Sequence, residues 1–120
     1  MFNEVIQSVV NGTEGAIAGT LMDFQGCSVG SYTKDPTNEE LMEKIGAEFS
    51  VVVKSIQRAA ESLEAGDANE VAICTDRMTT VIRVVNQDYF MAVALGPEGN
   101  VGKARYLLRT HAPKVLDLLQ

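Results

Sequence analysis

The chain has 120 residues, the usual size of one domain, so residues 1–120 are expected to form a single folding unit. Hydrophobic residues make up 46% and charged residues 22%, proportions typical of globular proteins that argue against global disorder. The formal net charge is −6, and no basic stripe stands out along the sequence. This balance argues against nucleic-acid binding and against docking on anionic lipid.

The two cysteines, Cys27 and Cys74, are too few for a disulfide framework or a metal-binding set. Both lie in apolar, strand-like runs, so we expect them to be buried as small hydrophobic side chains. The N-terminal residues lack the basic start of a signal peptide, and no apolar run approaches the roughly 20 residues of a membrane span. These features predict a cytoplasmic protein with no metal site and no membrane span.

The spacing of apolar residues predicts elements in the order α-β-β-α-β-β-β-α. The first two strands are joined by a short turn as a hairpin, and the last three form a meander. Pro113 is expected to bend or interrupt the last helix near His111. Helices are expected over residues 2–11, 38–64 and 103–120, and strands over residues 16–24, 27–33, 70–76, 79–85 and 89–95.

A hairpin and a meander together predict a five-stranded antiparallel sheet. Its central strands are apolar on both faces, which requires helices on both sides. With three helices for two faces, we expect the terminal helices together on one face and the long middle helix alone on the other. The predicted fold class is α+β, an α/β sandwich.

The middle helix carries a wider apolar surface than one contact with a sheet needs. At 100° per residue its apolar residues cover an arc of about 140°, against the ~100° typical of a helix with one buried stripe. The excess favours burial of one flank against a second copy of the same helix, and cover by the adjoining loop is the alternative. The arc contains Leu41, Met42, Ile45, Gly46, Phe49, Val52, Val53, Ile56, Ala59, Ala60 and Leu63.

The opposite, outward face of this helix places two small apolar residues, Ala47 and Val51, among charged and polar ones that include Lys54, Ser55 and Arg58. This is a modest exposed patch, and its functional interpretation is a contact surface for another protein. Ordinary surface variation is the alternative, because single exposed hydrophobic residues are common.

No arrangement of residues points to catalysis. His111 is the sole histidine, and no nucleophile stands at a recognisable spacing from it. Residues 96–104 join a strand to a helix as a phosphate-binding loop does, but Ala104 stands where a hydroxyl should hold magnesium and Glu98 adds negative charge. We therefore expect no enzyme activity and no cofactor, which favours a binding or scaffolding role.

The element order resembles the Roadblock (dynein light chain) family, in its small single-domain bacterial and archaeal form. Residues 15–26 (GAIAGTLMDFQG) are similar to the first hairpin of the family, and residues 95–109 (LGPEGNVGKARYLLR) are similar to its turn into the C-terminal helix. Between them a long helix ends in LEAG and an apolar meander follows. The resemblance covers nearly the whole chain.

The resemblance implies a homodimer in which two middle helices pair and two sheets join into one. It implies a non-catalytic scaffold or regulator that binds a Ras-like small GTPase on the paired helices, with or without an effect on GTP hydrolysis. The residues then expected to bind the GTPase are Ala47, Val51, Lys54, Ser55 and Arg58. Those expected at the dimer interface are Gly46, Val53, Ala60, Val71, Ile73 and Thr75.

A small-molecule sensor of the profilin or PAS kind is the alternative function, with a ligand held between sheet and helix. The large apolar side chains on both sheet faces argue against it, because a ligand pocket needs open space and converging polar groups.

Overall fold

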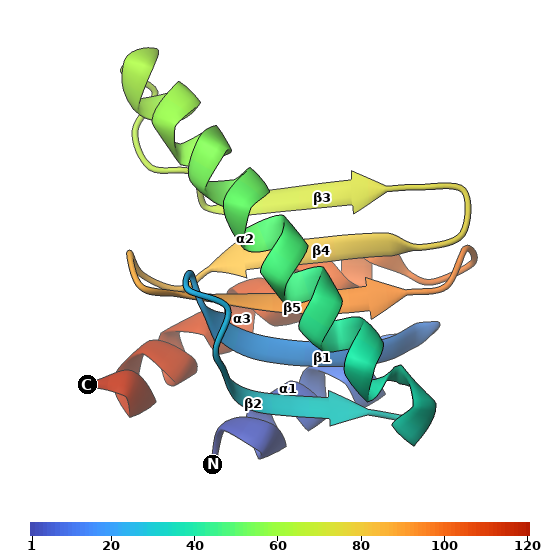
Figure 1. Ribbon diagram of the computed structural model, residues 1–120. Helices are drawn as coiled ribbons and strands as arrows, with labels where there is room; N and C mark the ends of the chain where they lie inside the picture. The colour runs from blue at the N-terminus through green and yellow to red at the C-terminus, as the bar shows by residue number, and fades with distance from the viewer.

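The computed structural model describes residues 1–120 and confirms the predicted order of elements (Figure 1). Each observed boundary lies within a few residues of its expected position. The elements are α1 (Phe2–Asn11), β1 (Ala16–Asp23), β2 (Ser28–Thr33), the short 3-10 helix η1 (Pro36–Asn38), α2 (Glu39–Ser62), β3 (Glu70–Cys74), β4 (Thr79–Val84), β5 (Tyr89–Leu95) and α3 (Val101–Leu119).

The five strands form one sheet in the order β2-β1-β5-β4-β3, and every neighbouring pair is antiparallel. β5 and β1 are buried at nearly every position and lie in the interior of the sheet, where both faces are covered. β2 and β3 are its two edges and are largely exposed or half-buried. The antiparallel five-stranded sheet expected from the sequence is therefore confirmed.

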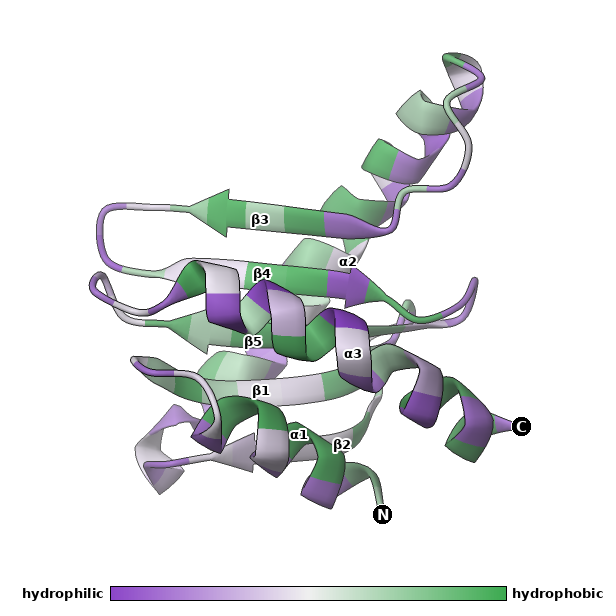
Figure 2. Ribbon diagram, turned by 180° about the vertical axis from the view of Figure 1, so that it is seen from behind, coloured by the Kyte–Doolittle hydropathy of each residue, from purple (hydrophilic) through white to green (hydrophobic).

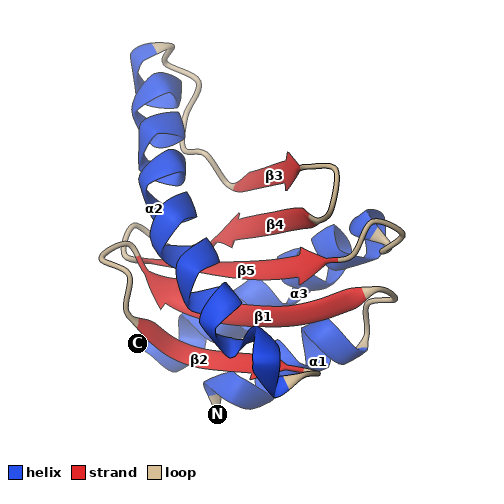
Figure 3. Ribbon diagram, turned by 45° about the vertical axis from the view of Figure 1, so that its right-hand side comes forward, coloured by secondary structure: helices blue, strands red, loops and turns tan.

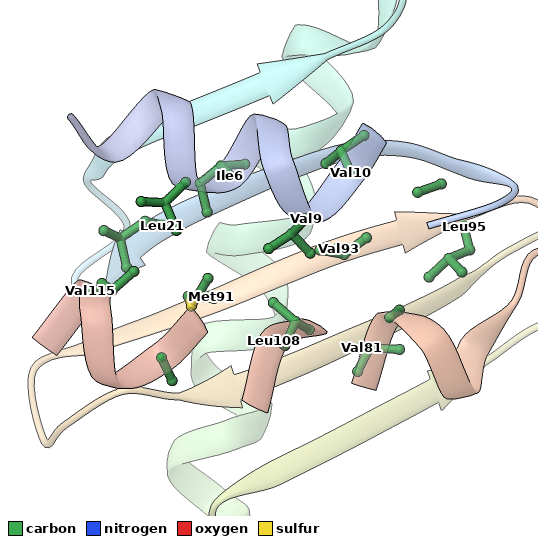
Figure 4. Close-up of a cluster of buried hydrophobic side chains, with 14 residues drawn as sticks. Ile6, Val9, Val10, Leu21, Val81, Met91, Val93, Leu95, Leu108 and Val115 are labelled. Carbon is green, nitrogen blue, oxygen red and sulfur yellow. The ribbon is translucent and has the colours of Figure 1, made fainter. Parts of the chain in front are cut away.

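The helices cover the sheet as expected, with α1 and α3 on one face and α2 on the other (Figures 1 and 2). On the face of α1 and α3, the largest hydrophobic cluster packs Ile6, Val9 and Leu108 against residues of the central strands such as Leu21 and Met91 (Figure 4). Full burial of an aliphatic side chain contributes roughly 1.5–3 kcal/mol, so this cluster is the main source of stability.

The core under α2 is made of two smaller clusters. One contains Val53 of α2 with Met22, Ile82 and Phe90 of the sheet, and the ring of Phe24 lies 5.0 Å from that of Phe90. The other packs Met42 and Ile45 on Ala18 and Ala94. These side chains fill the space between the sheet and the helix.

The expected burial of both cysteines is wrong, because Cys27 and Cys74 are exposed. Cys27 lies in the turn that leads into edge strand β2. Cys74 is the last residue of edge strand β3, where its sulfur accepts a hydrogen bond of 3.3 Å from the Thr79 hydroxyl. Apolar neighbours along the chain do not bury a residue at the margin of a sheet.

The expected break at Pro113 is also not found, since α3 runs without interruption from Val101 to Leu119 with Pro113 inside it. Beyond the proline, Val115 is fully buried and Leu118 and Leu119 pack against the same core. This burial offsets the hydrogen bond that proline cannot donate. None of the three helices combines the length and the apolar character needed to cross a bilayer.

Candidate functional site

The middle helix α2 crosses the sheet obliquely, and its C-terminal end extends beyond the sheet (Figures 1 and 3). It lies closest to β1 and β2, and a side chain at Gly46 would overlap that of Met22, so this glycine lets the helix approach the sheet. Val53 is the last buried residue of α2. The remaining turns project past the edge of the sheet at β3, and the loop that follows α2 runs back beside them to β3 (Figures 1 and 3).

One flank of this end of α2, from Val52 to the C-cap residue Leu63, is apolar and partly exposed. Val52 is 41% exposed and Leu63 is 77% exposed, Ala59 is exposed, and Ile56 and Ala60 are half-buried. All five belong to the wide apolar arc that the sequence indicates. The alternative cover, the loop after α2, leaves Leu63 open to solvent.

The adjacent edge strand β3 is uncovered too. It pairs with β4 alone, so the hydrogen-bonding groups of its outer edge have no strand partner. Val71 and Ile73 are half-buried on the face of α2 and pack near Val53, while Ala72 and Thr75 are exposed. The apolar flank of α2 and the open edge of β3 thus lie at the same border of the molecule.

The expected interface residues divide into two groups. Gly46 and Val53 are buried within their own protomer, where they contact Met22 and its neighbours, so they have no surface to offer to a second chain. Ala60, Val71, Ile73 and Thr75 retain accessible surface at the border of β3. An interface between two chains at this border would therefore not include Gly46 or Val53.

The outward face of α2 brings the other expected residues together. Ala47, Val51, Lys54, Ser55 and Arg58 are all exposed, and Val51 is 65% exposed. Arg58 donates a hydrogen bond of 3.5 Å to the hydroxyl of Ser55, and neither cation of this face forms an ion pair. The face combines a small apolar centre with two free positive charges.

Sequence reasoning missed a neighbour of this face, the turn between β1 and β2. The ammonium group of Lys54 lies 6.0 Å from the ring centre of Phe24 in that turn. Lys54 and Phe24 line a shallow hollow, and Gln87 and Asp88 of the β4–β5 turn line it too. No signal in the sequence indicates this proximity, because it depends on the angle at which α2 crosses the sheet.

The hollows of the surface are open and mostly polar. One hollow, of about 610 Å³, lies under the projecting end of α2 and is lined mostly by polar residues, among them Gln57, Glu61 and Asn86. No three His, Cys, Asp or Glu side chains lie where they could share a metal ion. The ring nitrogen Nδ1 of His111 lies 2.8 Å from the carbonyl oxygen of Leu107 in the same helix.

No family model matches the chain, and no curated protein matches it. Among solved structures, MglC from Myxococcus xanthus is 40% identical over 97% of each chain, with a TM-score of 0.69. A Roadblock/LC7 domain from Streptomyces avermitilis is 16% identical over 98% of this chain and 96% of that one, with a TM-score of 0.85. MglB from Myxococcus xanthus is 12% identical over 98% and 94%, also with a TM-score of 0.85. The last two show the shared fold, and the likeness to MglC extends to the sequence.

Proposed function

Because this chain belongs to the Roadblock/LC7 family, we propose that it is a homodimeric, non-catalytic scaffold or regulator that binds a Ras-like small GTPase in the cytoplasm. One observation carries the proposal: the uncovered apolar flank of α2 and the unpaired edge of β3 meet at one border of the sheet. Two exposed free cysteines, Cys27 and Cys74, fit a reducing compartment.

A second copy of the chain is the simplest partner that would cover both the apolar flank of α2 and the unpaired edge of β3. An exposed strand edge is a hazard for aggregation, and pairing β3 with its twin removes it. A two-fold axis beside β3 extends one sheet into the next and lays the projecting end of each α2 near the partner. Leu63 and Val52 then leave water, and an aliphatic side chain gains roughly 1.5–3 kcal/mol on full burial.

The outward face of α2 is the proposed GTPase-binding surface. In such a dimer the two α2 helices lie on the same side of the joined sheet, so the faces around Val51 form one platform. An apolar centre with charged residues around it is a common layout of protein interfaces. Lys54 and Arg58 supply the charges here, and the Roadblock family supplies the expectation that the partner is a Ras-like GTPase.

The replacement Val51→Asp tests this surface. We expect it to weaken binding of the cognate GTPase by about thirtyfold, because it buries a carboxylate where a central apolar contact stood. Calorimetry with the GTPase loaded with GDP or with a GTP analogue measures the change. Val29→Asp, another exposed valine but on β2, is the matched control and should bind as the wild type does. Unchanged binding by Val51→Asp would rule this surface out.

A further inference from the structure

The outward face of α3 differs in charge from the rest of the molecule. This helix holds four of the ten Lys and Arg residues, against one carboxylate, while the whole chain carries −6. No basic stripe stands out in the sequence because these residues are spread among apolar ones along the chain. All four are exposed on a helix that lies on the outside of the sheet (Figure 2).

Only one of these four cations is neutralised by a neighbour. Arg105 makes an ion pair of 2.7 Å with Glu70 on β3, which raises the pKa of its guanidinium group. Lys103, Arg109 and Lys114 are exposed and form no ion pair. Three positive charges thus face solvent on a helix whose only acidic residue is Asp117.

A tyrosine lies between two of the free cations. The ring of Tyr106 is 49% exposed, with the ammonium group of Lys103 5.5 Å and the guanidinium carbon of Arg109 5.8 Å from its centre. At 100° per residue, Thr110, Lys114 and the acidic Asp117 continue the stripe of Lys103 and Tyr106, and Arg109 lies about 60° to one side of Tyr106. We call Lys103, Tyr106, Arg109, Thr110 and Lys114 the α3 patch. An apolar ring flanked by cations suits an anion that also carries apolar groups.

We propose that the α3 patch docks a short acidic segment of another protein. Two or three carboxylates match its free cations, and an apolar side chain between them can rest on Tyr106. An anionic membrane usually recruits four to eight basic residues, and nucleic acid is held by a larger set of phosphate contacts. The acidic remainder of the chain repels both of these extended polyanions.

This surface lies on the opposite side of the sheet from α2 (Figures 1 and 2). The inference therefore does not depend on the proposed GTPase-binding surface. One molecule has room for a partner on each face, which is the geometry of an adaptor.

A charge-reversal pair tests the proposal on the full chain. The probe is a short fluorescent peptide of alternating glutamate and leucine, and its neutral analogue has glutamine in place of glutamate. We expect the wild type to bind the acidic peptide and not the neutral one, with an affinity that falls as salt is added. The double variant Lys103→Glu/Arg109→Glu should weaken binding about tenfold or more, since two ion pairs become repulsions.

The matched control is Lys54→Glu/Arg58→Glu, which changes the net charge equally but on α2, and it should keep most of the peptide affinity. Tyr106→Ala, which leaves the charge alone, should weaken binding severalfold without altering its salt dependence. Circular dichroism confirms that each variant folds. Equal weakening by both double variants means a net-charge effect and overturns the proposal. It is also overturned if the neutral peptide binds equally well, or if phosphatidylserine vesicles or single-stranded DNA bind the α3 patch more tightly.

Discussion

Replacing Leu63 by aspartate is expected to convert the proposed dimer into a monomer without harming the protomer. Leu63 is 77% exposed in the single chain, so the protomer loses no core contact. In the dimer the same side chain is buried against the partner, and an unpaired carboxylate there costs several kcal/mol. The dissociation constant of the dimer should rise by about a hundredfold or more.

Light scattering after gel filtration at micromolar concentration measures this change. The wild type should have twice the 13.0 kDa mass of one chain, and Leu63→Asp should have that mass once. Val51→Asp is the control, because it lies on the outward face of the same helix and should stay dimeric. The thermal midpoint of the wild type should rise with protein concentration, and that of Leu63→Asp should not. A wild type that stays monomeric at every protein concentration tested would contradict the proposed homodimer, on which the proposed function rests.

The element order and the two-sided cover could be predicted from the sequence because both are local in origin. Period-2 and period-3.6 patterns mark each element, and strands that are apolar on both faces demand two helical layers. The continuity of the apolar pattern in β1 and β5 reflects their central place. The division of the three helices between the two faces of the sheet, two on one and one on the other, follows from their number, and no long-range information is needed for it.

The position of a residue within the sheet could not be predicted in the same way. Cys27 and Cys74 have apolar neighbours along the chain, yet Cys27 lies in the turn before edge strand β2 and Cys74 ends edge strand β3. Strand order is decided by contacts far apart in sequence. The crossing angle of α2 could not be predicted either, because it depends on the close contact between Gly46 and Met22. The local pattern gives the apolar arc but not which part of it extends beyond the sheet. The arc therefore includes Gly46 and Val53, which the protomer itself buries.

The charge of α3 is hidden in the sequence for another reason. A net charge of −6 averages over the whole surface, whereas binding depends on charges that share one face. A helical wheel places Lys103 and Lys114 within about 20° of each other but Arg109 about 120° from Lys103, so only the two lysines of the patch are within reach of sequence reasoning. Their lack of carboxylate partners is a tertiary property, since Glu70 reaches Arg105 from a distant strand.

The start of β1 is fixed by an unusually close approach of two backbones. Gly15 has a positive φ of 82°, and a Cβ atom there would overlap the Cα atom of Gly99 in the loop before α3. The same two segments share hydrogen bonds: the Gly96 amide donates to the Gly15 carbonyl at 2.9 Å, and the Asn100 amide to the Glu14 carbonyl at 2.8 Å. This contact joins the entry of the central strand to the start of α3.

Gly15→Ala is therefore expected to lower the free energy of unfolding by about 3 kcal/mol. Alanine at positive φ costs roughly 1–2 kcal/mol, and overlap with a neighbouring backbone adds a similar amount. Gly26→Ala is the matched control, because Gly26 also has a positive φ, 95°, but no atom lies within 4 Å of the position that a methyl group would take there. It should lose about 1 kcal/mol, from backbone strain alone.

Urea denaturation of both variants at one protein concentration measures the difference, which keeps any contribution from dimer formation equal. A loss for Gly15→Ala no larger than that for Gly26→Ala would mean that the loop before α3 moves aside at little cost. Asn100 of that loop is the N-cap of α3, and its side chain accepts a hydrogen bond from the Lys103 amide, so such freedom would also loosen the N-terminal end of the α3 patch. A stiff contact at Gly15 therefore supports a preformed docking surface on α3, which gains affinity because no loop has to be ordered on binding.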